Sequence, residues 1–429
     1  MDIFELAKAR ILAGKGGNTP GGGGGGGGST ASKKDVNFYD YDGTLLHSYT
    51  VAEAQALSEL PPLPTQKGLV CQGWNWTLED IKSYDCGIDV GASYITDDGK
   101  TRLYITITAR YGMEVPLYFS QTADSGAIVD WGDGSATETV SGTGVKNLTH
   151  KYTSAGDYVI TLDVVSGTIS LGNNKTYGVL GVFESAQTNM LKKVEFGNSA
   201  DVRTYAFYAC YSLKSITVPH GTSALSSWNL AGTKIPCYVI GNGATYVPQS
   251  AFQGSAIKIV SIPNTVTCFG QDAFAGCSAL SRILVPKGWA STAQNIFSGC
   301  VGLSNPIVIP KGNTYHVYPN EFYNCYSLPS VELLNSPGSI AHYAFCKCQS
   351  LTSMKVPSSV NQIDTSAFAS CTSMKFYDFT SHTTVPTLSS TTAFANIPTD
   401  CEIRVPAALY DEWIAATNWS TYASQIVAV

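Results

Sequence analysis

Large apolar residues recur at a regular spacing along the C-terminal half of the chain. Phenylalanines stand every 22 to 25 residues, at Phe252, Phe274, Phe297, Phe322, Phe345 and Phe368. Most are followed three residues later by a cysteine and three further on by an apolar residue, a pattern opened by Phe207, Cys210 and Leu213. A repeat of this length predicts a solenoid, in which each unit contacts only its neighbours.

Each repeat also contains a short alternating segment that ends at a proline. The clearest are residues 215–219, 281–286 and 353–357. Two apolar residues spaced two apart, such as Ile216 and Val218 or Ile283 and Val285, predict a strand with one buried face. The proline ends the strand because it lacks a backbone donor. Residues 220–250 lack a clear Phe and Cys, with Trp228 and Leu230 near the expected place, so a bulge is expected there.

The repeat cysteines are predicted to be small buried residues in register, since a free cysteine packs as a compact hydrophobe. They are therefore expected to be free thiols: Cys277, Cys300, Cys325, Cys348 and Cys371. Cys71 and Cys86 form the one isolated pair that could be joined, and they are expected to stay reduced. No Cys-x-x-Cys pair exists and histidines are scattered, so no metal site is predicted.

The layout of a strand followed by Ala-Phe-x-x-Cys over residues 169–406 resembles the BspA-type leucine-rich repeat family, found on bacterial surfaces and in gut bacteriophage proteins. That resemblance covers about half of the chain and implies an extended binding surface rather than an enclosed substrate site. Residues 407–429 are predicted to close the stack, with Leu409, Trp413 and Ala416 on one face of a helix.

Residues 113–168 carry a second pattern. Asp130, Trp131 and Asp133 in Asp-Trp-Gly-Asp-Gly, then His150 in His-Lys-Tyr and the run 156–162, resemble the polycystic kidney disease (PKD) domain. The resemblance implies a small β-sandwich that serves as a spacer or binding module. The alternation of Tyr158, Ile160 and Leu162 agrees with a strand that points these residues inward.

Residues 35–112 are predicted to form a small β-rich module. A hairpin is expected over 36–46 with its turn at Asp42 and Gly43, followed by a helix over 50–60 that Thr50 caps together with Glu53. With the Leu-Pro and Gly-Trp segments that follow, residues 36–76 resemble the β-grasp-like internalin B repeats of bacterial surface proteins.

The first 34 residues differ from the rest. Residues 1–13 place Ile3, Phe4, Ala7 and Ile11 on one side of a helix, which predicts a short amphipathic helix that folds against a partner. Residues 14–34 include an unbroken run of glycines from 21 to 28 and are expected to be a flexible linker. A helix on such a linker is interpreted as an anchor; the alternative is a frayed terminus without a role.

Charge and composition exclude several functions. The net charge is −6 and no run of Lys or Arg offsets it, which argues against nucleic acid. No apolar run approaches the length of a membrane span, so no membrane insertion is expected, and residues 1–13 do not resemble a signal peptide.

One segment resembles an enzyme. Asp40 and Asp42, in Asp-Tyr-Asp-Gly-Thr, resemble the first motif of haloacid dehalogenase phosphatases, in which the first Asp is the nucleophile and the second a general acid. That chemistry also needs Mg²⁺ and a Lys on a parallel α/β sheet. The surrounding pattern is antiparallel, so a turn is preferred and no catalytic residue or cofactor is assigned.

These features predict a mainly β, multidomain, non-enzymatic protein for adhesion or receptor binding. The first hypothesis is a bacteriophage virion protein, a tail or head fibre made in the host cytoplasm. It would join a virion structural protein through its N-terminal helix and bind bacterial surface glycan or protein, or mucin. The alternative is a bacterial cell-surface leucine-rich-repeat adhesin, and the phosphatase is third. Trimers are common among phage fibres, so a homotrimer is considered, but no heptad region enforces one. The ligand-binding residues are not assigned.

Overall fold

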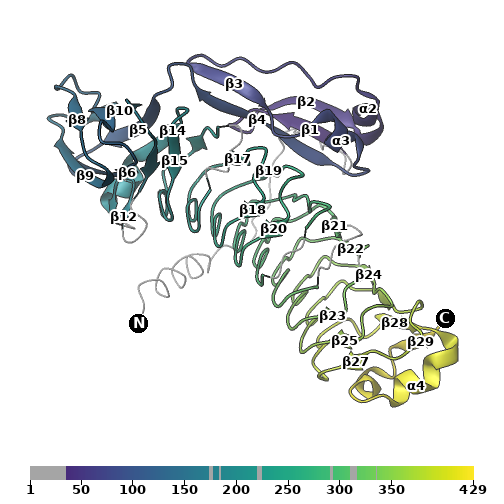
Figure 1. Cartoon of the computed structure of the whole chain (residues 1–429). Coiled ribbons are helices and arrows are strands. Elements are labelled where there is room, and N and C mark those ends of the chain that lie inside the picture. The colour runs from purple at the N-terminus through teal and green to yellow at the C-terminus, as the bar shows by residue number, and fades with distance from the viewer. Residues whose placement is uncertain are drawn as a thin grey trace, which may run out of the picture.

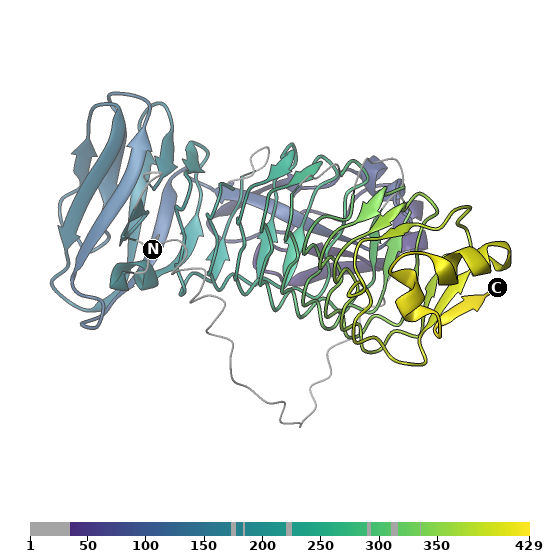
Figure 2. The ribbon, with the colours of Figure 1, turned by 90° about the horizontal axis from the view of Figure 1, so that it is seen from below.

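The computed structural model describes residues 35–172, 177–182, 185–219, 225–289, 293–309, 316–334 and 336–429. The predicted anchor helix (1–13) and glycine linker (14–34) lie outside these residues. As predicted, the chain is mainly β. A stack of coils runs from a β-sandwich to a short C-terminal helix, as Figures 1 and 2 show. Every helix in the described ranges falls short of the length and apolarity needed to cross a bilayer.

The N-terminal module is a four-stranded sheet in the order β2-β1-β4-β3, with β1 parallel to β4, which is a β-grasp-like arrangement. The predicted hairpin is present, and its turn places Gly43 at a φ of +91°, which glycine adopts without strain. Thr50 and Glu53 form the predicted capping box. The helix ends at Ala56, short of residue 60. The elements are β1 (Asp35–Tyr39), β2 (Leu45–Thr50), α2 (Val51–Ala56), β3 (Leu69–Trp74), α3 (Leu78–Lys82) and β4 (Ile88–Thr96).

The sandwich consists of two sheets. The first has the order β16-β14-β5-β10-β7-β8 and the second β15-β11-β6-β9. Trp131, Ile160 and Leu162 are buried between them as predicted, while Tyr158 is only partly buried against the same core. The strands are β5 (Thr101–Ile107), β6 (Glu114–Gln121), β7 (Ala127–Asp130), β8 (Glu138–Val140), β9 (Gly144–Lys151), β10 (Gly156–Val164), β11 (Ile169–Leu171), β14 (Leu191–Glu195), β15 (Ala200–Val202) and β16 (Ser215–Ile216).

The sequence placed the limits of this sandwich at 113 and 168, and the sheet topology corrects both. Strand β5 pairs with β10 and buries Leu103, Ile105 and Ile107 in the sandwich core, so the sandwich begins near residue 101. At its other side, β14, β15 and β16 of the first coils extend the two sandwich sheets. One continuous apolar core therefore runs through the sandwich and the solenoid.

The coils stack their strands in parallel on two sides of the solenoid. One side holds β17 (Cys237–Val239) with β19 (Ile259–Ser261), β21 (Ile307–Ile309) with β22 (Val331–Leu333), and the series β24 (Ser353–Lys355), β26 (Phe376–Asp378), β28 (Glu402–Val405) and β29 (Ile426–Ala428). The other holds β18 (Tyr246–Val247) with β20 (Cys268–Phe269), and β23 (Ser339–Ile340), β25 (Gln362–Ile363) and β27 (Thr387–Leu388). Smaller elements near the sandwich are β12 (Tyr177–Gly178), β13 (Gly181–Val182) and η1 (Ala186–Met190).

One predicted strand is absent. Residues 281–286 bury Ile283 and Val285 as expected but do not join a ladder. The reason lies in their outward side chains: Arg282 bonds to Asp89, and Leu284 packs on the core of the N-terminal module. This segment is therefore held by the module as well as by the next coil, where Ser304 N donates to Ser281 O at 3.1 Å.

The periodic phenylalanines form a continuous stack of rings inside the solenoid. Successive centroids lie 5.2 to 5.7 Å apart, with planes within 13° of parallel. The members are Phe252, Phe274, Phe297, Phe322, Phe345, Phe368 and Phe394, all with 0% exposure. Phe394 was missed because Ile397 stands where the cysteine is expected. The stack confirms the predicted repeat.

The repeat cysteines are buried free thiols, as predicted, and also hydrogen-bond donors. Each thiol points at the carbonyl oxygen of a phenylalanine in a preceding coil at 3.0 to 3.2 Å, from Cys277 to Phe252 through Cys371 to Phe345. A cysteine thus fills the small site and satisfies a backbone acceptor, which alanine cannot do.

The expected bulge in residues 220–250 is not found in the described part, 225–250. Leu230 takes the place of the ring, since its backbone N donates to Ala251 O at 2.9 Å, as Phe252 N does to Ala273 O. The coil therefore stays in register with a leucine in place of a phenylalanine.

The C-terminal segment closes the stack, as predicted. It contains η2 (Ala407–Leu409), α4 (Tyr410–Ala415) and η3 (Trp419–Tyr422), and its last strand, β29, pairs with β28. Trp413 and Trp419 are fully buried with ring centroids 4.6 Å apart, and Trp419 Nε1 donates to Pro386 O at 2.8 Å. These rings cover the last coil, whose apolar edge has no following repeat.

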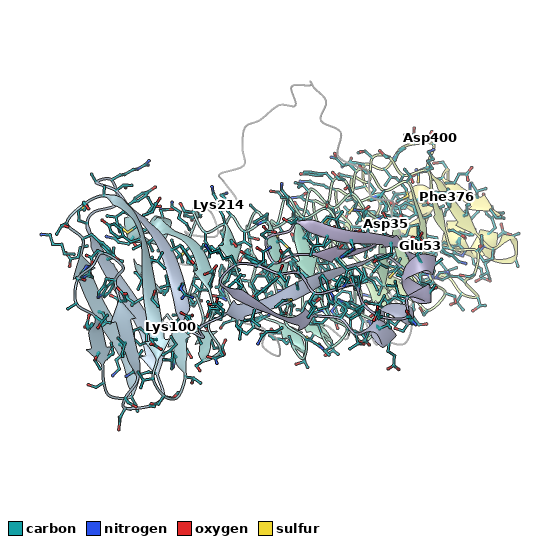
Figure 3. The ribbon with its side chains drawn as sticks, turned by 90° about the horizontal axis from the view of Figure 1, so that it is seen from above. Asp35, Glu53, Lys100, Lys214, Phe376 and Asp400 are labelled. Carbon is teal, nitrogen blue, oxygen red and sulfur yellow. The ribbon has the colours of Figure 1, made fainter. Side chains whose placement is uncertain are left out.

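The N-terminal module lies along the β17 and β19 side of the solenoid (Figures 1 and 3). Asn75 is fully buried in this interface. Its amide donates to Ile240 O at 2.8 Å and Ser261 O at 3.2 Å, and its side-chain oxygen accepts from Ser261 Oγ at 2.9 Å. Arg282 pairs with Asp89 close by. The module is thus joined to the solenoid by satisfied polar contacts.

Candidate functional site

The turns that carry the stacked rings form one row along the solenoid, here called the turn edge. Each turn bends sharply, with left-handed backbone two residues before and two after the ring in most coils. Examples are Asn320 (φ +54°) and Asn324 (φ +60°) around Phe322. Asparagine and glycine favour this backbone, whereas other residues there are strained.

Three tyrosines and a lysine gather on the turn edge in the middle of the solenoid. Tyr326 and Tyr343 are 38% and 40% exposed. The rings of Tyr323 and Tyr343 meet edge to face at 6.3 Å, and Lys347 Nζ lies 5.4 Å from the centre of the Tyr323 ring. We call Tyr323, Tyr326, Tyr343 and Lys347 the tyrosine patch.

Two members of the patch occupy strained backbone. Tyr343 has φ +57° and Lys347 has φ +63°, where the coil would be relaxed with glycine or asparagine. For an ordinary side chain this costs on the order of 1 to 2 kcal/mol. Nothing in the packing of the coil requires a large ring at residue 343, since the ring is exposed. The same left-handed backbone recurs two residues before the ring in other coils, for example at Tyr205 and Ser366, so the exposure of the Tyr343 ring, rather than its backbone, sets this residue apart.

The patch offers aromatic faces, hydroxyls and one cation. Lys347 Nζ donates to Tyr323 Oη at 3.4 Å, and this bond raises the pKa of the Lys347 ammonium. Tyrosine combines a rigid apolar ring with a polar tip and is enriched where proteins bind partners. The patch can therefore contact the apolar face of a ligand and bond to its polar groups.

A second aromatic cluster nearer the sandwich has a structural role. Tyr205 stacks on Trp228 at 6.1 Å, and Tyr208 meets Trp228 edge to face at 5.8 Å. Trp228 is only 8% exposed and Tyr208 3%, so this cluster is a small satellite core. Trp228, noted in the sequence as a departure from the repeat, stabilises the turn of the coil that lacks a phenylalanine.

Asp40 and Asp42, the two residues that resemble the phosphatase motif, stabilise a turn. Asp40 is buried, and its carboxylate accepts from Tyr41 N at 2.8 Å and Gln66 Nε2 at 2.5 Å. Asp42 accepts from Thr44 N at 2.9 Å within the same turn. Both carboxylates thus stabilise the backbone that joins β1 to β2, as the preferred interpretation predicts.

Asp133 likewise holds local structure in the sandwich. It accepts from Ser135 N at 3.0 Å and from His150 Nε2 at 2.7 Å, and the His150 ring stacks on Trp131 at 4.8 Å. Hydrogen bonds from Ser135 and His150 lower the pKa of the Asp133 carboxyl. Among the described residues, no group of three or more His, Cys, Asp and Glu side chains lies in a position to hold a metal ion.

The predicted anchor residues Ile3, Phe4, Ala7 and Ile11 lie outside the described residues, so their role stays a prediction. The sequence reasoning did not find the tyrosine patch. Its signal was present, because Tyr323 and Tyr326 flank Cys325 and Tyr343 precedes Phe345 by two. Because the phenylalanine ring of each repeat points into the core, the tyrosines beside it in the turn point outward.

Comparison with solved structures found leucine-rich repeat proteins. One is a leucine-rich repeat protein from Bacteroides ovatus, 18% identical over 56% of this chain and 84% of that one, with a TM-score of 0.25. Another is a leucine rich cell surface protein from Faecalibacterium prausnitzii, 17% identical over 53% of this chain and 80% of that one, with a TM-score of 0.26. A third, from Eubacterium ventriosum, is 14% identical over 55% and 92%, with a TM-score of 0.26.

No curated protein sequence matches the chain. The PKD resemblance of residues 113–168 has no counterpart in the family match and stays a prediction. The profile described as "BspA type Leucine rich repeat region" matches six copies over residues 182–304 and 315–409, which is just over half of the chain. The chain therefore belongs to the BspA-type leucine-rich repeat family.

Proposed function

We propose that this protein is a non-enzymatic adhesion protein of the bacterial cell surface, which binds glycan or protein, including mucin, through the turn edge of its solenoid. The tyrosine patch carries this proposal, because Tyr326 and Tyr343 expose large rings next to Tyr323 and Lys347. The BspA-type family supports the location.

The architecture supports binding at the turn edge in a second way. The N-terminal module covers strands β17 and β19, so part of the strand face is already occupied. Its polar contacts reach Ile240, Ser261 and Asn264, which lie outside the turns. The turn edge therefore offers a long row of repeated positions that a polymeric ligand can follow.

A glycan and mucin array tests the proposal. The full chain is expected to bind one class of glycan or glycoprotein, and Tyr323→Ala with Tyr343→Ala is expected to weaken that binding at least about tenfold, since hot-spot rings each contribute about 2 kcal/mol. Tyr246→Ala removes a tyrosine that is 42% exposed on strand β18, outside the tyrosine patch, and serves as the control. Binding that survives the double substitution unchanged would contradict the turn-edge site.

A second candidate is attachment to a bacteriophage virion. The apolar positions Ile3, Phe4, Ala7 and Ile11, followed by the glycine run, favour it as a tethered anchor for a virion structural protein. A truncated chain that begins at Lys34 should then keep its glycan binding but fail to join particles. Phe4→Asp with Ile11→Asp should reproduce that failure, because a charge on the buried face is costly to desolvate. Full incorporation of the truncated chain would exclude this candidate.

A further inference from the structure

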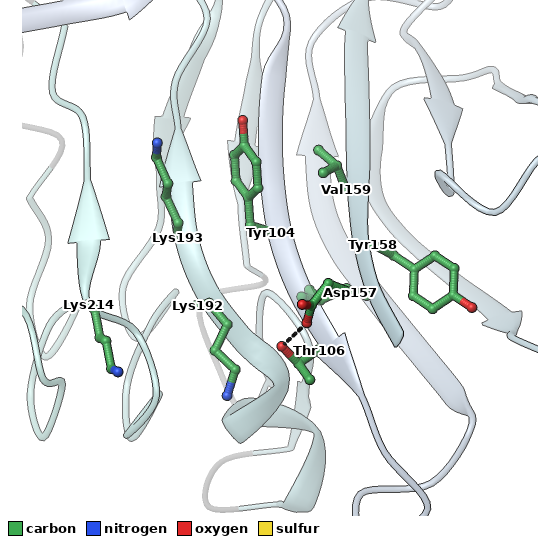
Figure 4. Close-up of a pocket in the computed structure, with 9 residues that line it drawn as sticks. Tyr104, Thr106, Asp157, Tyr158, Val159, Lys192, Lys193 and Lys214 are labelled. Atoms are coloured by element: carbon green, nitrogen blue, oxygen red, sulfur yellow. Dashed lines mark hydrogen bonds between the residues drawn. The ribbon is translucent and has the colours of Figure 1, made fainter. Parts of the chain in front are cut away.

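A groove of about 450 Å³ lies where the sandwich meets the first coils, far along the chain from the tyrosine patch. Figure 4 shows its walls. Tyr104 and Thr106 come from β5, Asp157 from β10, Lys192 and Lys193 from β14, and Lys214 from the residue before β16. Because these strands belong to one sheet, the groove is a fixed part of the fold rather than a gap between mobile parts.

Lys193 already has partners within the protein. Its Nζ lies 2.6 Å from Glu195 Oε1 and 5.2 Å from the centre of the Tyr104 ring, and Tyr104 Oη donates to the other oxygen of Glu195 at 2.6 Å. This network neutralises the charge of Lys193 and orients the Tyr104 ring at the groove. Lys193 is therefore a positioning residue there.

Lys192 and Lys214 are different. Among the described residues neither is in an ion pair, and Lys192 Nζ donates only to Asn189 O at 3.2 Å. Their backbones are adjacent, since Lys214 N donates to Lys192 O at 2.9 Å. Burial and the charge of Lys214 lower the pKa of the Lys192 ammonium. Lys234, on the next coil, is exposed, and its N donates to Leu213 O at 3.0 Å, so it extends the row.

This row of lysines is not required by the coil. Later coils make the same backbone bond without two lysines. Ser304 N donates to Ser281 O at 3.1 Å, and Lys375 N donates to Thr352 O at 2.8 Å. Adjacent strands lie about 4.8 Å apart, and like charges at that distance destabilise a sheet. Lysines on successive coils therefore carry a cost that a bound anion would offset.

Asp157 restricts which anion can fit. Its carboxylate lies in the groove and accepts from Thr106 Oγ1 at 2.6 Å, as the dashed line in Figure 4 marks. A polyanion that offers no hydroxyls would be repelled by this carboxylate. A ligand that carries both anionic groups and hydroxyls would place the anions on the lysines and the hydroxyls on the remaining acceptor positions of Asp157.

We propose that this groove binds an acidic saccharide, with Lys192 and Lys214 as the anion-binding residues, Lys234 as their extension, and Asp157 as the acceptor of sugar hydroxyls. Carboxylate and sulfate groups both meet this description. The proposal rests on the proposed glycan-binding function and names the class of glycan. It adds a site separate from the tyrosine patch.

The test measures the affinity of the full chain for polygalacturonate, dextran sulfate and neutral dextran by titration calorimetry at fixed ionic strength. We expect binding to one or both acidic polymers and none to neutral dextran, and the preferred polymer distinguishes carboxylate from sulfate. Lys192→Gln with Lys214→Gln should weaken binding at least about tenfold. Lys375→Gln, which removes an exposed lysine from the corresponding place in a late coil, should leave binding unchanged.

Asp157→Asn separates a saccharide site from a general polyanion site. It should weaken binding of the acidic saccharide while strengthening binding of a single-stranded DNA probe. Equal affinity of the unaltered protein for DNA and for the acidic polymers, or equal loss in the Lys375→Gln control, would overturn the proposal. If mucin binding depends on the tyrosines but no acidic polymer binds, the groove is excluded and the proposed function stands. If acidic polymers bind through the lysines but Tyr323→Ala with Tyr343→Ala changes no binding, the turn-edge site fails and the groove stands.

Discussion

Removing one ring from the middle of the phenylalanine stack should destabilise the whole solenoid. Phe274 has 0% exposure and stacks on Phe252 at 5.2 Å and on Phe297 at 5.7 Å, with Phe269 edge-on at 5.6 Å. Phe274→Ala leaves a cavity that cannot collapse, because the backbone bonds of the flanking coils hold the neighbouring rings in place. We expect a loss of about 3 to 5 kcal/mol in the free energy of unfolding.

Equilibrium urea unfolding measures this loss, and tryptophan fluorescence is a suitable probe. Trp289 packs on Phe269 at 5.5 Å, so it reports on the altered coil. The midpoint should fall while the slope with urea stays near that of the unaltered protein. Lys258→Ala, on an exposed position of the preceding coil, should change stability by less than about 0.5 kcal/mol. A midpoint for Phe274→Ala equal to that of this control would refute the stacked-ring assignment.

Three further results are expected. Burial raises the pKa of the Cys371 thiol to about 12, so the repeat cysteines should resist iodoacetamide at pH 8 in the folded protein and react after unfolding; rapid labelling before unfolding would argue against the stack. Hydrogen bonds depress the pKa of Asp133, so its contribution to stability is present above its unfolded pKa of about 3.9 and is lost as the pH falls below it. The stability difference between the unaltered protein and Asp133→Asn should therefore shrink between pH 5 and pH 2, and a difference that stays constant would contradict this. Arg282→Ala leaves Asp89 without its partner and should lower the free energy of unfolding by about 1.5 to 3 kcal/mol. Proteolysis between residues 97 and 100 should also become faster. An unchanged proteolysis rate would show that the N-terminal module is held without this pair.

The stack was predictable because its signal is local and repeated. A phenylalanine every 22 to 25 residues, with a cysteine three residues later, fixes which side chains face inward without any knowledge of distant contacts. The same periodicity missed Phe394 because the cysteine is replaced there by Ile397. The periodicity also predicted only a packing role for the cysteines. The hydrogen bonds from their thiols to carbonyl oxygens such as Phe252 O are seen only when the coils are stacked.

The domain limits and the docking of the N-terminal module depend on pairings between distant segments. Strand β5 has the alternation of any half-buried strand, and only its pairing with β10 assigns it to the sandwich. Asn75 bonds to residues 165 and 186 positions away, at Ile240 and Ser261. Nothing in the local sequence of Asn75 distinguishes a buried interface amide from an exposed loop residue.

The tyrosine patch lies between these cases. The repeat predicts that Tyr323, Tyr326 and Tyr343 point outward, but whether they lie close together depends on coils whose lengths are not equal. The strain at Tyr343 follows only from its φ of +57° in the folded chain. Sequence alone therefore gives the surface on which they lie, and the structure gives the cluster.

The central claim is that a rigid solenoid presents exposed tyrosines to a ligand. The most direct measurement compares the affinity of the unaltered protein and of Tyr343→Ala for the best ligand from the glycan and mucin array, together with their unfolding midpoints. Tyr343 is 40% exposed and alanine keeps the same backbone, so the substitution should weaken binding while leaving stability nearly unchanged. Undiminished affinity in a folded Tyr343→Ala protein, or a loss of affinity that merely follows a loss of stability, would contradict the claim.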